Sequence, residues 1–226
     1  ITSGWDPELL AYQVVTDCSV FFWPVTELWV DSFSTQALHH YISLARAPRP
    51  HRIRFTNELL SKKLTEWGYY SIGTATSEWA IDYACQADDL GISEENLKYF
   101  PTYLDGVITY NIESQYNIAD PRITGALVNV VLESSYEQLN LSMIEDSMWR
   151  VPFITEKTIK AFALGQIPLI LGPGNQVALT RSLGFDMFDD IVDHSYDTET
   201  DPLVRIKRFT TSLEQFINKY PTSSLQ

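Results

Sequence analysis

Apolar runs of strand length alternate with helix-length stretches from about residue 39 onward. The runs at 39–45, 69–73, 125–135 and 167–172 are short, rich in apolar residues and bounded by polar residues, proline or glycine. Such runs are typical of strands that are buried on both faces. The run at 125–135, "GALVNVVLESS", is the clearest of them. We therefore predict four strands at these positions.

The stretches between and after these strands have helical spacing. Residues 51–67 carry apolar side chains at near-helical intervals, and Gly68 is the predicted stop. Glu156–Leu164 precedes Gly165, and the stretch 175–183 precedes Gly184. A last helix is predicted from Asp201 to Tyr220, because Asp-Pro is a good N-cap followed by a first-turn proline. Its predicted apolar stripe consists of Leu203, Ile206, Phe209, Leu213 and Phe216.

This order of elements predicts the fold class and the domain boundaries. Strands that alternate with helices indicate an α/β fold, a Rossmann-like parallel sheet flanked by helices. We assign it to residues 39–226 and set apart 1–38 as an aromatic amino-terminal segment. Ligands of such sheets bind beyond the carboxyl ends of the strands. The strand-ending residues Arg46, Ser71, Glu133 and Gly172 are expected at that edge.

Composition and charge narrow the function. The chain has 226 residues, 45% of them hydrophobic, and a formal net charge of -13. The acidic charge therefore argues against a nucleic-acid partner, because nucleic acids bind basic surfaces. Cys18 and Cys85 are too few for a zinc site or a disulfide framework; we expect two buried thiols and keep one disulfide as the alternative. The sequence shows no membrane span, and a cytoplasmic location, in a host or viral setting, is the expectation.

The tripeptide Thr155-Glu156-Lys157 stands where a helix should begin. Thr155 is a good N-cap, and Glu156 in the first turn complements the helix dipole. Lys157 is not explained in this way, because a cation is mildly unfavourable there. A bound anion would reverse that sign, and Glu156 can accept hydrogen bonds from a ribose diol. We therefore interpret the pair as a candidate sugar-nucleotide clamp.

A second candidate is the loop "RAPRPHR", which contains Arg46, Arg49, His51 and Arg52. It follows a predicted strand and precedes a predicted helix, and guanidinium groups suit phosphate oxygens. A solvated basic turn is the alternative. The glycine-rich patterns of phosphate-binding loops and dinucleotide folds are absent from the sequence.

An acidic cluster, Asp189, Asp190, Asp193 and Asp197, lies near the carboxyl end of the chain. It could bind a cation, but its spacing is not that of a calcium-binding loop. A solvated acidic face or helix capping is the preferred interpretation.

The stretch from residue 128 to 172 carries a family resemblance. Val130-Val131-Leu132-Glu133-Ser134-Ser135, Phe153-Ile154-Thr155-Glu156-Lys157, Ala161-Phe162 and Gly165-Gln166-Ile167-Pro168-Leu169 resemble, in order and spacing, the donor-binding signature of fucosyltransferase-like glycosyltransferases. The loop 46–52 and the segment 183–206 further resemble virus- and phage-encoded glycosyltransferases with that core. Two positions depart from the family pattern: Phe153 occupies the position of a tyrosine in the family, and Ser134 that of an asparagine.

The resemblance implies the carboxy-terminal, donor-binding half of a GT-B glycosyltransferase. The implied reaction transfers a sugar from a nucleotide-diphosphate sugar, GDP being favoured, without an obligatory metal or other cofactor. It also implies inversion at the anomeric carbon, with a carboxylate base from the amino-terminal part; Asp17, Glu27 and Asp31 are candidates. The implied donor-binding residues are Arg49, Arg52, Glu133, Ser135, Phe153, Glu156 and Lys157.

Within that set the resemblance gives some residues a specific role. Glu156 would hold the ribose, while Lys157 and either Arg52 or Arg49 would hold the diphosphate. Phe153 would keep the stacking of the family's tyrosine without its hydroxyl.

Two other functions stay open on the sequence. The chain could be a noncatalytic nucleotide-sugar-binding domain of a larger viral protein, or a scaffold that contacts a partner through the aromatic segment 1–38. Binding of a nucleotide without transfer would favour the first, and no nucleotide binding would favour the second. The sequence does not identify the acceptor, which could be a glycan, a protein or another molecule.

Overall fold

The computed structural model describes residues 37–45, 47–73, 82–83, 85–104, 120–136, 152 and 154–221. The predicted segment 1–38 lies outside them except for Ala37 and Leu38. Arg46, Phe153 and the side chain of Glu156 also lie outside the described part. So do the candidate bases, Asp17, Glu27 and Asp31.

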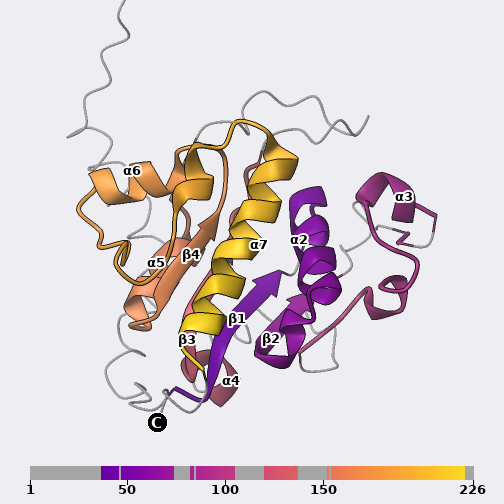
Figure 1. The fold of residues 1–226 in the computed structure, drawn as a ribbon, viewed down its shortest axis with the longest axis horizontal. Coiled ribbons are helices and arrows are strands. Elements are labelled where there is room, and N and C mark those ends of the chain that lie inside the picture. The colour runs from indigo at the N-terminus through magenta and orange to yellow at the C-terminus, as the bar shows by residue number, and fades with distance from the viewer. Residues whose placement is uncertain are drawn as a thin grey trace, which may run out of the picture.

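A parallel sheet of four strands forms the centre of the molecule (Figure 1). Its strands are β1 (His39–Ala45), β2 (Gly68–Ile72), β3 (Ala126–Leu132) and β4 (Ile167–Leu171). The spatial order is β2-β1-β3-β4, and every pair of neighbours is parallel. The four predicted strands and the Rossmann-like α/β class are thus confirmed.

The strand order reverses between β1 and β3. From β1 the chain crosses to β2 on one side, and then returns to place β3 on the other side of β1. In open α/β sheets such a reversal opens a crevice at the carboxyl ends of the two central strands, where ligands bind. We call the carboxyl ends of β1 and β3, with the residues that follow them, the switch-point corner.

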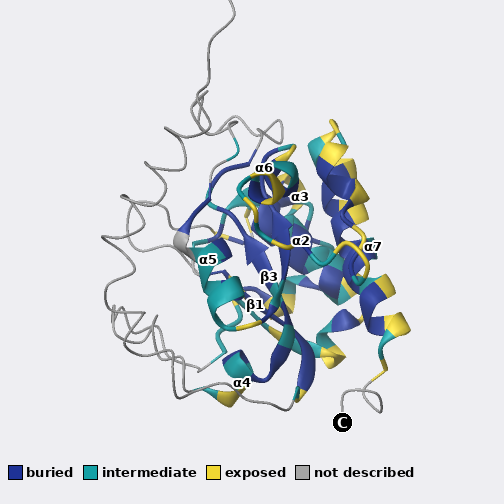
Figure 2. Cartoon of the chain, turned by 90° about the vertical axis from the view of Figure 1, so that its left-hand side faces the viewer, coloured by how far each residue is buried: buried dark blue, intermediate teal, exposed yellow. Residues whose placement is uncertain are grey.

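Helices cover both faces of the sheet (Figure 2). α2 (Pro50–Ser61) and α7 (Pro202–Lys219) lie on one face, and α5 (Glu156–Ala163) lies on the other. The crossovers β1–α2–β2 and β3–α5–β4 run in opposite directions along the sheet, so right-handed connections place their helices on opposite faces. The remaining helices are shorter: α3 (Ala87–Leu90), α4 (Pro121–Thr124) and α6 (Gln176–Ser182).

The core between the sheet, α2 and α7 is apolar and rich in aromatic side chains. Phe55 of α2 meets Phe209 of α7 edge to face, with ring centroids 5.2 Å apart. Both rings are fully buried, as are Leu59 and Leu169. Each such side chain contributes about 1.5–3 kcal/mol by leaving water. This packing fixes α2 and α7 against the strands that carry the switch-point corner.

The last helix begins as predicted but buries a different set of residues. Asp201 accepts hydrogen bonds from the backbone amides of Leu203 and Val204, so it is the N-cap of α7. The predicted stripe is wrong at Leu203, which is 38% exposed, whereas Arg205 is 3% exposed. The first turn of α7 therefore turns a basic residue, not a leucine, toward the interior.

The predicted helix 51–67 ends earlier than expected. α2 stops at Ser61, Lys63 takes a left-handed conformation with φ 56°, and a 3-10 turn covers Leu64–Glu66. Gly68 begins β2 and does not stop a helix, so that prediction is wrong. A Cβ atom at Gly68 would lie 2.4 Å from the carbonyl oxygen of Tyr41, so this position needs glycine because β1 and β2 approach closely.

Two further sequence expectations meet the structure here. Cys85 is exposed, so the prediction that it is buried is wrong. Within the described ranges, no helix has the length and apolar character that crossing a bilayer requires.

Candidate functional site

The switch-point corner joins two segments that are far apart in the sequence. The loop 47–49 and the first turn of α2 follow β1, and residues 133–136 follow β3. Because β1 and β3 are parallel neighbours, both segments leave the sheet at the same edge. The predicted loop 46–52 and the predicted donor-binding residues Glu133 and Ser135 therefore meet in space, except that Arg46 is not described.

Arg52 ties these two segments together. Its side chain is buried; Nη1 donates to the carbonyl oxygen of Ala47 at 3.0 Å, and Nη2 donates to those of Leu132 and Glu133, each at 3.0 Å. Charge-assisted hydrogen bonds of this kind are the stronger ones in proteins. Arg52 thus fixes the geometry of the corner, and its predicted contact with a diphosphate stays a prediction.

Glu133 connects three elements at the end of β3. Its backbone amide donates to Leu171 of β4, and its carbonyl oxygen accepts from Arg52. Its side chain is fully buried, and each carboxyl oxygen accepts a threonine hydroxyl at 2.7 Å, from Thr155 and from Thr158. The structure therefore places the Glu133 carboxyl between β3 and α5. Its contact with a donor stays a prediction.

The start of α5 carries Lys157 beside the end of β3. The Thr155 hydroxyl accepts the backbone amide of Lys157 at 3.2 Å, which confirms Thr155 as the N-cap. The half-buried Lys157 extends back so that Nζ donates to Ser134 Oγ at 3.3 Å. The next residue, Ser135, is fully buried, and its Oγ has no hydrogen-bond partner among the described residues.

His51 was singled out in the loop sequence, but its partners were not. The ring is buried, and Nε2 lies 2.9 Å from the carbonyl oxygen of Glu133. It stacks on Tyr136, with centroids 4.7 Å apart and planes inclined by 16°. The pKa of His51 is held well below its ordinary value by burial and by the neighbouring charges of Arg52 and Arg49.

Tyr136 and Arg205 are corner residues that the sequence reasoning missed. Tyr136 donates from its hydroxyl to the carbonyl oxygen of Pro202 at 2.7 Å, and the Arg205 guanidinium lies 5.6 Å from the Tyr136 ring centroid. Arg205 also donates to carbonyl oxygens of Glu199 at 2.8 Å and Gly172 at 3.4 Å. A signal existed: Arg205 shares the helical stripe of Phe209, four residues later.

Basic side chains dominate this corner although the whole chain is acidic. Arg49 is half-buried at the N-cap position of α2, and burial lowers its pKa. With Arg52 and Lys157 it makes three cationic side chains, against the buried carboxyl of Glu133. In a chain of net charge -13 this local excess is suited to an anionic ligand.

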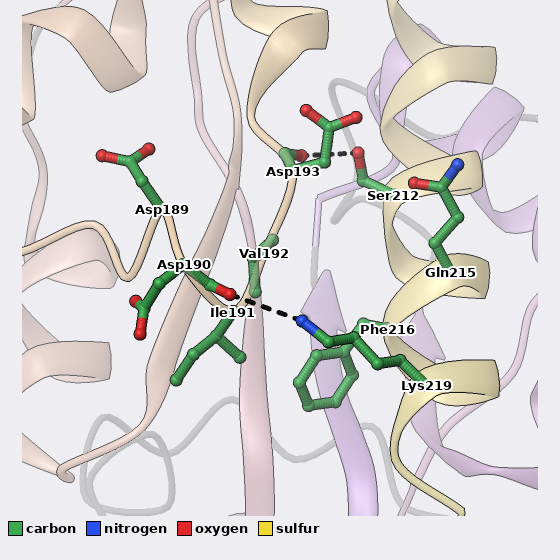
Figure 3. A pocket seen from close by; sticks show the side chains of 9 residues that line it. All are labelled: Asp189, Asp190, Ile191, Val192, Asp193, Ser212, Gln215, Phe216 and Lys219. Atoms are coloured by element: carbon green, nitrogen blue, oxygen red, sulfur yellow. Dashed lines mark hydrogen bonds between the residues drawn. The ribbon is translucent and has the colours of Figure 1, made fainter.

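A cavity of about 300 Å³ lies elsewhere, between residues 189–193 and the second half of α7 (Figure 3). Its wall includes Asp190, Asp193 and Phe216, and Lys219 crosses it to donate to the Asp190 carbonyl oxygen at 3.4 Å. None of the predicted donor-binding residues lines it. The cavity and the switch-point corner are separate features.

The acidic cluster mostly serves local structure. Asp197 accepts the backbone amides of Val177 and Ala178, each at 3.0 Å, at the start of α6. Asp189 accepts two hydrogen bonds from Arg181. In the part of the chain that the structure describes, no three histidine, cysteine or acidic side chains gather in a way that could hold a metal ion.

The fold alone does not choose an activity for this site. Parallel α/β sheets of this class carry many unrelated functions, so only the residues at the edge can indicate the activity. Those residues offer cations, hydroxyls and helix starts for an anionic ligand, gathered where the strand order reverses. Comparisons of the chain with protein-family models, with curated proteins and with solved structures find no match.

Proposed function

We propose that the chain binds a nucleotide-diphosphate sugar at the switch-point corner and transfers the sugar to an acceptor. One observation carries the proposal: the reversal of strand order brings the loop 47–52, the segment 133–136 and the start of α5 to one edge. These are the segments in which the sequence resembles the donor site of fucosyltransferase-like glycosyltransferases.

Lys157 and Arg49 are proposed to bind the diphosphate. Each is half-buried at the start of a helix that follows one of the two central strands. Two cations and helix amides can neutralise a diphosphate without a metal ion. GDP is the proposed nucleotide, on the resemblance alone.

Arg52 and Glu133 are proposed as positioning residues. The Arg52 side chain donates to backbone carbonyl oxygens, and the Glu133 carboxyl accepts threonine hydroxyls, within the corner. Glu156 is proposed to hold the ribose and Phe153 to stack near the base, with Ser135 close to the phosphates.

In the proposed reaction an acceptor hydroxyl attacks the anomeric carbon, and the bond from that carbon to the diphosphate oxygen breaks. The nucleoside diphosphate leaves with the bonding electrons, and a carboxylate base takes the acceptor's proton. Lys157 and Arg49 would stabilise the charge that grows on the leaving diphosphate. The acceptor is a glycan, a protein or another molecule.

A noncatalytic nucleotide-sugar-binding domain is the second candidate. Glu133 is the carboxyl that the described residues place at this corner, and both of its oxygens accept threonine hydroxyls. It is therefore not placed to act as the base. The candidate bases Asp17, Glu27 and Asp31 lie outside the described residues.

Thermal unfolding with a panel of GDP, UDP, ADP, CMP and dTDP tests the binding step. A ligand that binds the native state raises its stability by RT ln(1 + [L]/Kd). We expect one base to raise Tm, the Lys157→Ala variant to lose that shift, and a Lys207→Ala control on the exposed side of α7 to keep it. No shift with any nucleotide at millimolar concentration would contradict the proposal.

A donor-hydrolysis and transfer assay separates the two candidates. Release of free sugar or of glycosylated acceptor from the donor that binds supports the transferase. Stoichiometric binding with neither product supports the noncatalytic domain.

A further inference from the structure

The contacts of His51 within the protein explain its position without a ligand. Its ring lies between α2, which carries it, and the segment 133–136, which it touches twice. It contacts the carbonyl oxygen of Glu133 through Nε2 at 2.9 Å, and it stacks on Tyr136. Tyr136 in turn bonds to Pro202 at the start of α7. The imidazole is therefore the centre of a chain of contacts that joins α2, the end of β3 and α7.

The chemistry of these contacts fixes the state of the imidazole. A carbonyl oxygen only accepts, so Nε2 must carry the hydrogen in the hydrogen bond to Glu133. In the neutral ring the proton is then absent from Nδ1. A second proton would create a buried cation, and burial without a charged partner is costly.

The charged groups around the ring oppose that second proton. Arg49 and Arg52 come from the same helix, and Arg205 of α7 lies against the other partner of the stack, Tyr136. The one carboxyl that the described residues bring to this corner, that of Glu133, is already bonded to Thr155 and Thr158. Protonation of His51 would thus add a cation to a group of three arginines.

We propose that His51 is a proton-operated latch of the switch-point corner. The neutral imidazole holds residues 133–136 against α2 and α7, and its protonation releases that segment. The half of the corner that follows β3 then loses its fixed position relative to α2. This inference does not depend on which ligand the corner binds, or on whether it binds one.

The expected direction of the pH effect follows from burial and from the arginines. Burial first, and then the charges of Arg52 and Arg49, hold the pKa of His51 well below 6.5, its ordinary value, although the hydrogen bond to the Glu133 carbonyl oxygen acts in the opposite direction. The released state therefore binds the proton more readily than the latched state. The latched state is therefore fully favoured above pH 6.5 and loses stability as pH falls below it. Over that interval the released population grows by up to about tenfold per pH unit, for one linked proton.

His194 provides a matched control within the same chain. It too is buried, with Nε2 2.7 Å from the carbonyl oxygen of Met187 and Nδ1 3.2 Å from the Tyr196 hydroxyl. Its charged surroundings differ, because Asp189 and Asp197 lie near it as well as Arg181. Its hydrogen bonds go to Tyr196 and Met187, not to the segment 133–136, so its protonation should leave that segment in place.

Nuclear magnetic resonance of the full chain, labelled for histidine rings and backbone amides, tests the latch without any ligand. The pH is lowered from 7.5 toward the onset of acid unfolding. We expect the His51 ring and the Ser134 and Ser135 amides to change with one common midpoint, below pH 6.5. Hydrogen exchange at those amides, corrected for its intrinsic pH dependence, should rise by up to about tenfold per pH unit below 6.5.

Two variants complete the test. His51→Gln keeps an amide donor that can reach Glu133 and cannot take a proton, so the change at Ser134 and Ser135 should vanish; His194→Gln should keep it. The latch is overturned if those amides respond to pH in His51→Gln as they do in the native chain. It is also overturned if they stay unchanged in the native chain while the His51 ring titrates. Absence of any His51 titration before unfolding would overturn it as well. If His51→Gln does not fold, the comparison of midpoints in the native chain decides.

Discussion

Two corners at the carboxyl edge of the sheet each contain a buried carboxyl group, but the two groups accept hydrogen bonds from different kinds of donor. At the switch-point corner, the buried carboxyl of Glu133 accepts side-chain hydroxyls from Thr155 and Thr158. At the corner beyond β4, the buried carboxyl of Asp197 accepts backbone amides from the first turn of α6. We call the second one the β4 corner; it comprises residues 172–178 and Asp197.

The difference decides which corner can take an anion. Helix starts attract anions because their first amides lack partners within the helix. In α6 the chain's own carboxylate, Asp197, fills that role. In α2 the N-cap residue is Arg49, a basic residue, which gives no side-chain cap bond among the described contacts. At the β4 corner the amides at the start of α6 are already bonded to Asp197, whereas the switch-point corner carries basic side chains.

The largest expected effect comes from removing the guanidinium that holds the switch-point corner. Arg52→Ala leaves the carbonyl oxygens of Ala47, Leu132 and Glu133 without this donor. A buried polar group that loses its partner costs about 1–3 kcal/mol, so we expect a loss of about 3–4 kcal/mol in the free energy of unfolding. Urea unfolding followed by circular dichroism measures it.

Arg208→Ala is the control for that loss, because Arg208 is more than half exposed and pairs with Glu199 at 3.2 Å. Exposed ion pairs contribute about 0–1 kcal/mol. Equal losses in the two variants would show that Arg52 does not hold the corner.

A smaller loss is expected at the β4 corner. Asp197→Ala removes two hydrogen bonds to amides at the start of α6, and loss of a helix cap costs about 0.5–2 kcal/mol. We expect about 2 kcal/mol by the same urea measurement. Asp190→Ala, which changes an exposed side chain on the cavity wall, should stay within about 0.5 kcal/mol of the native chain. A loss at Asp190 as large as that at Asp197 would contradict the capping role.

Sequence reasoning reached the sheet and the helix starts because their signals are local. An apolar run bounded by polar residues specifies a buried strand, and Thr155 and Asp201 cap the helices that directly follow them. The end of α2 was missed because Lys63 takes a left-handed conformation without the glycine that usually marks one.

The inner arrangement of the corner could not be read in the same way, because its partners are distant in the chain. Arg52 bonds to a carbonyl 80 residues away, and Glu133 to hydroxyls 22 and 25 residues away. The residue types predicted an anion site. Only packing decides that Arg52 and Glu133 turn inward while Lys157 lies against Ser134.

The two corners should also respond to pH with opposite signs. Burial raises the pKa of Asp197, against the opposing effect of its amide hydrogen bonds and of Arg205. The proton-linked part of its contribution to stability is therefore complete below pH 3.8 and is lost as pH rises through its folded pKa, while its hydrogen bonds to the amides of α6 remain. The pKa of His51 is lowered, so its contribution is lost as pH falls below 6.5.

Unfolding free energies measured from pH 4 to pH 7 test this contrast. The native curve minus the Asp197→Asn curve should fall with rising pH, and the native curve minus the His51→Gln curve should rise. One proton gives a slope of at most about 1.4 kcal/mol per pH unit. Slopes of the same sign for both variants would remove the contrast between the corners.

The smallest expected effect probes the anion preference directly with inorganic pyrophosphate. At a concentration equal to Kd, a ligand stabilises the native state by about 0.4 kcal/mol, which raises Tm by about 1 °C for a chain of this size. We expect Arg49→Ala to lose that rise and Arg181→Ala, beside the β4 corner, to keep it, because Asp197 already occupies the amides of α6. High salt should abolish the rise in every variant, since it screens partly exposed charges. A rise that survives Arg49→Ala would place the anion away from the start of α2, and one that disappears in Arg181→Ala would show that the β4 corner is not closed.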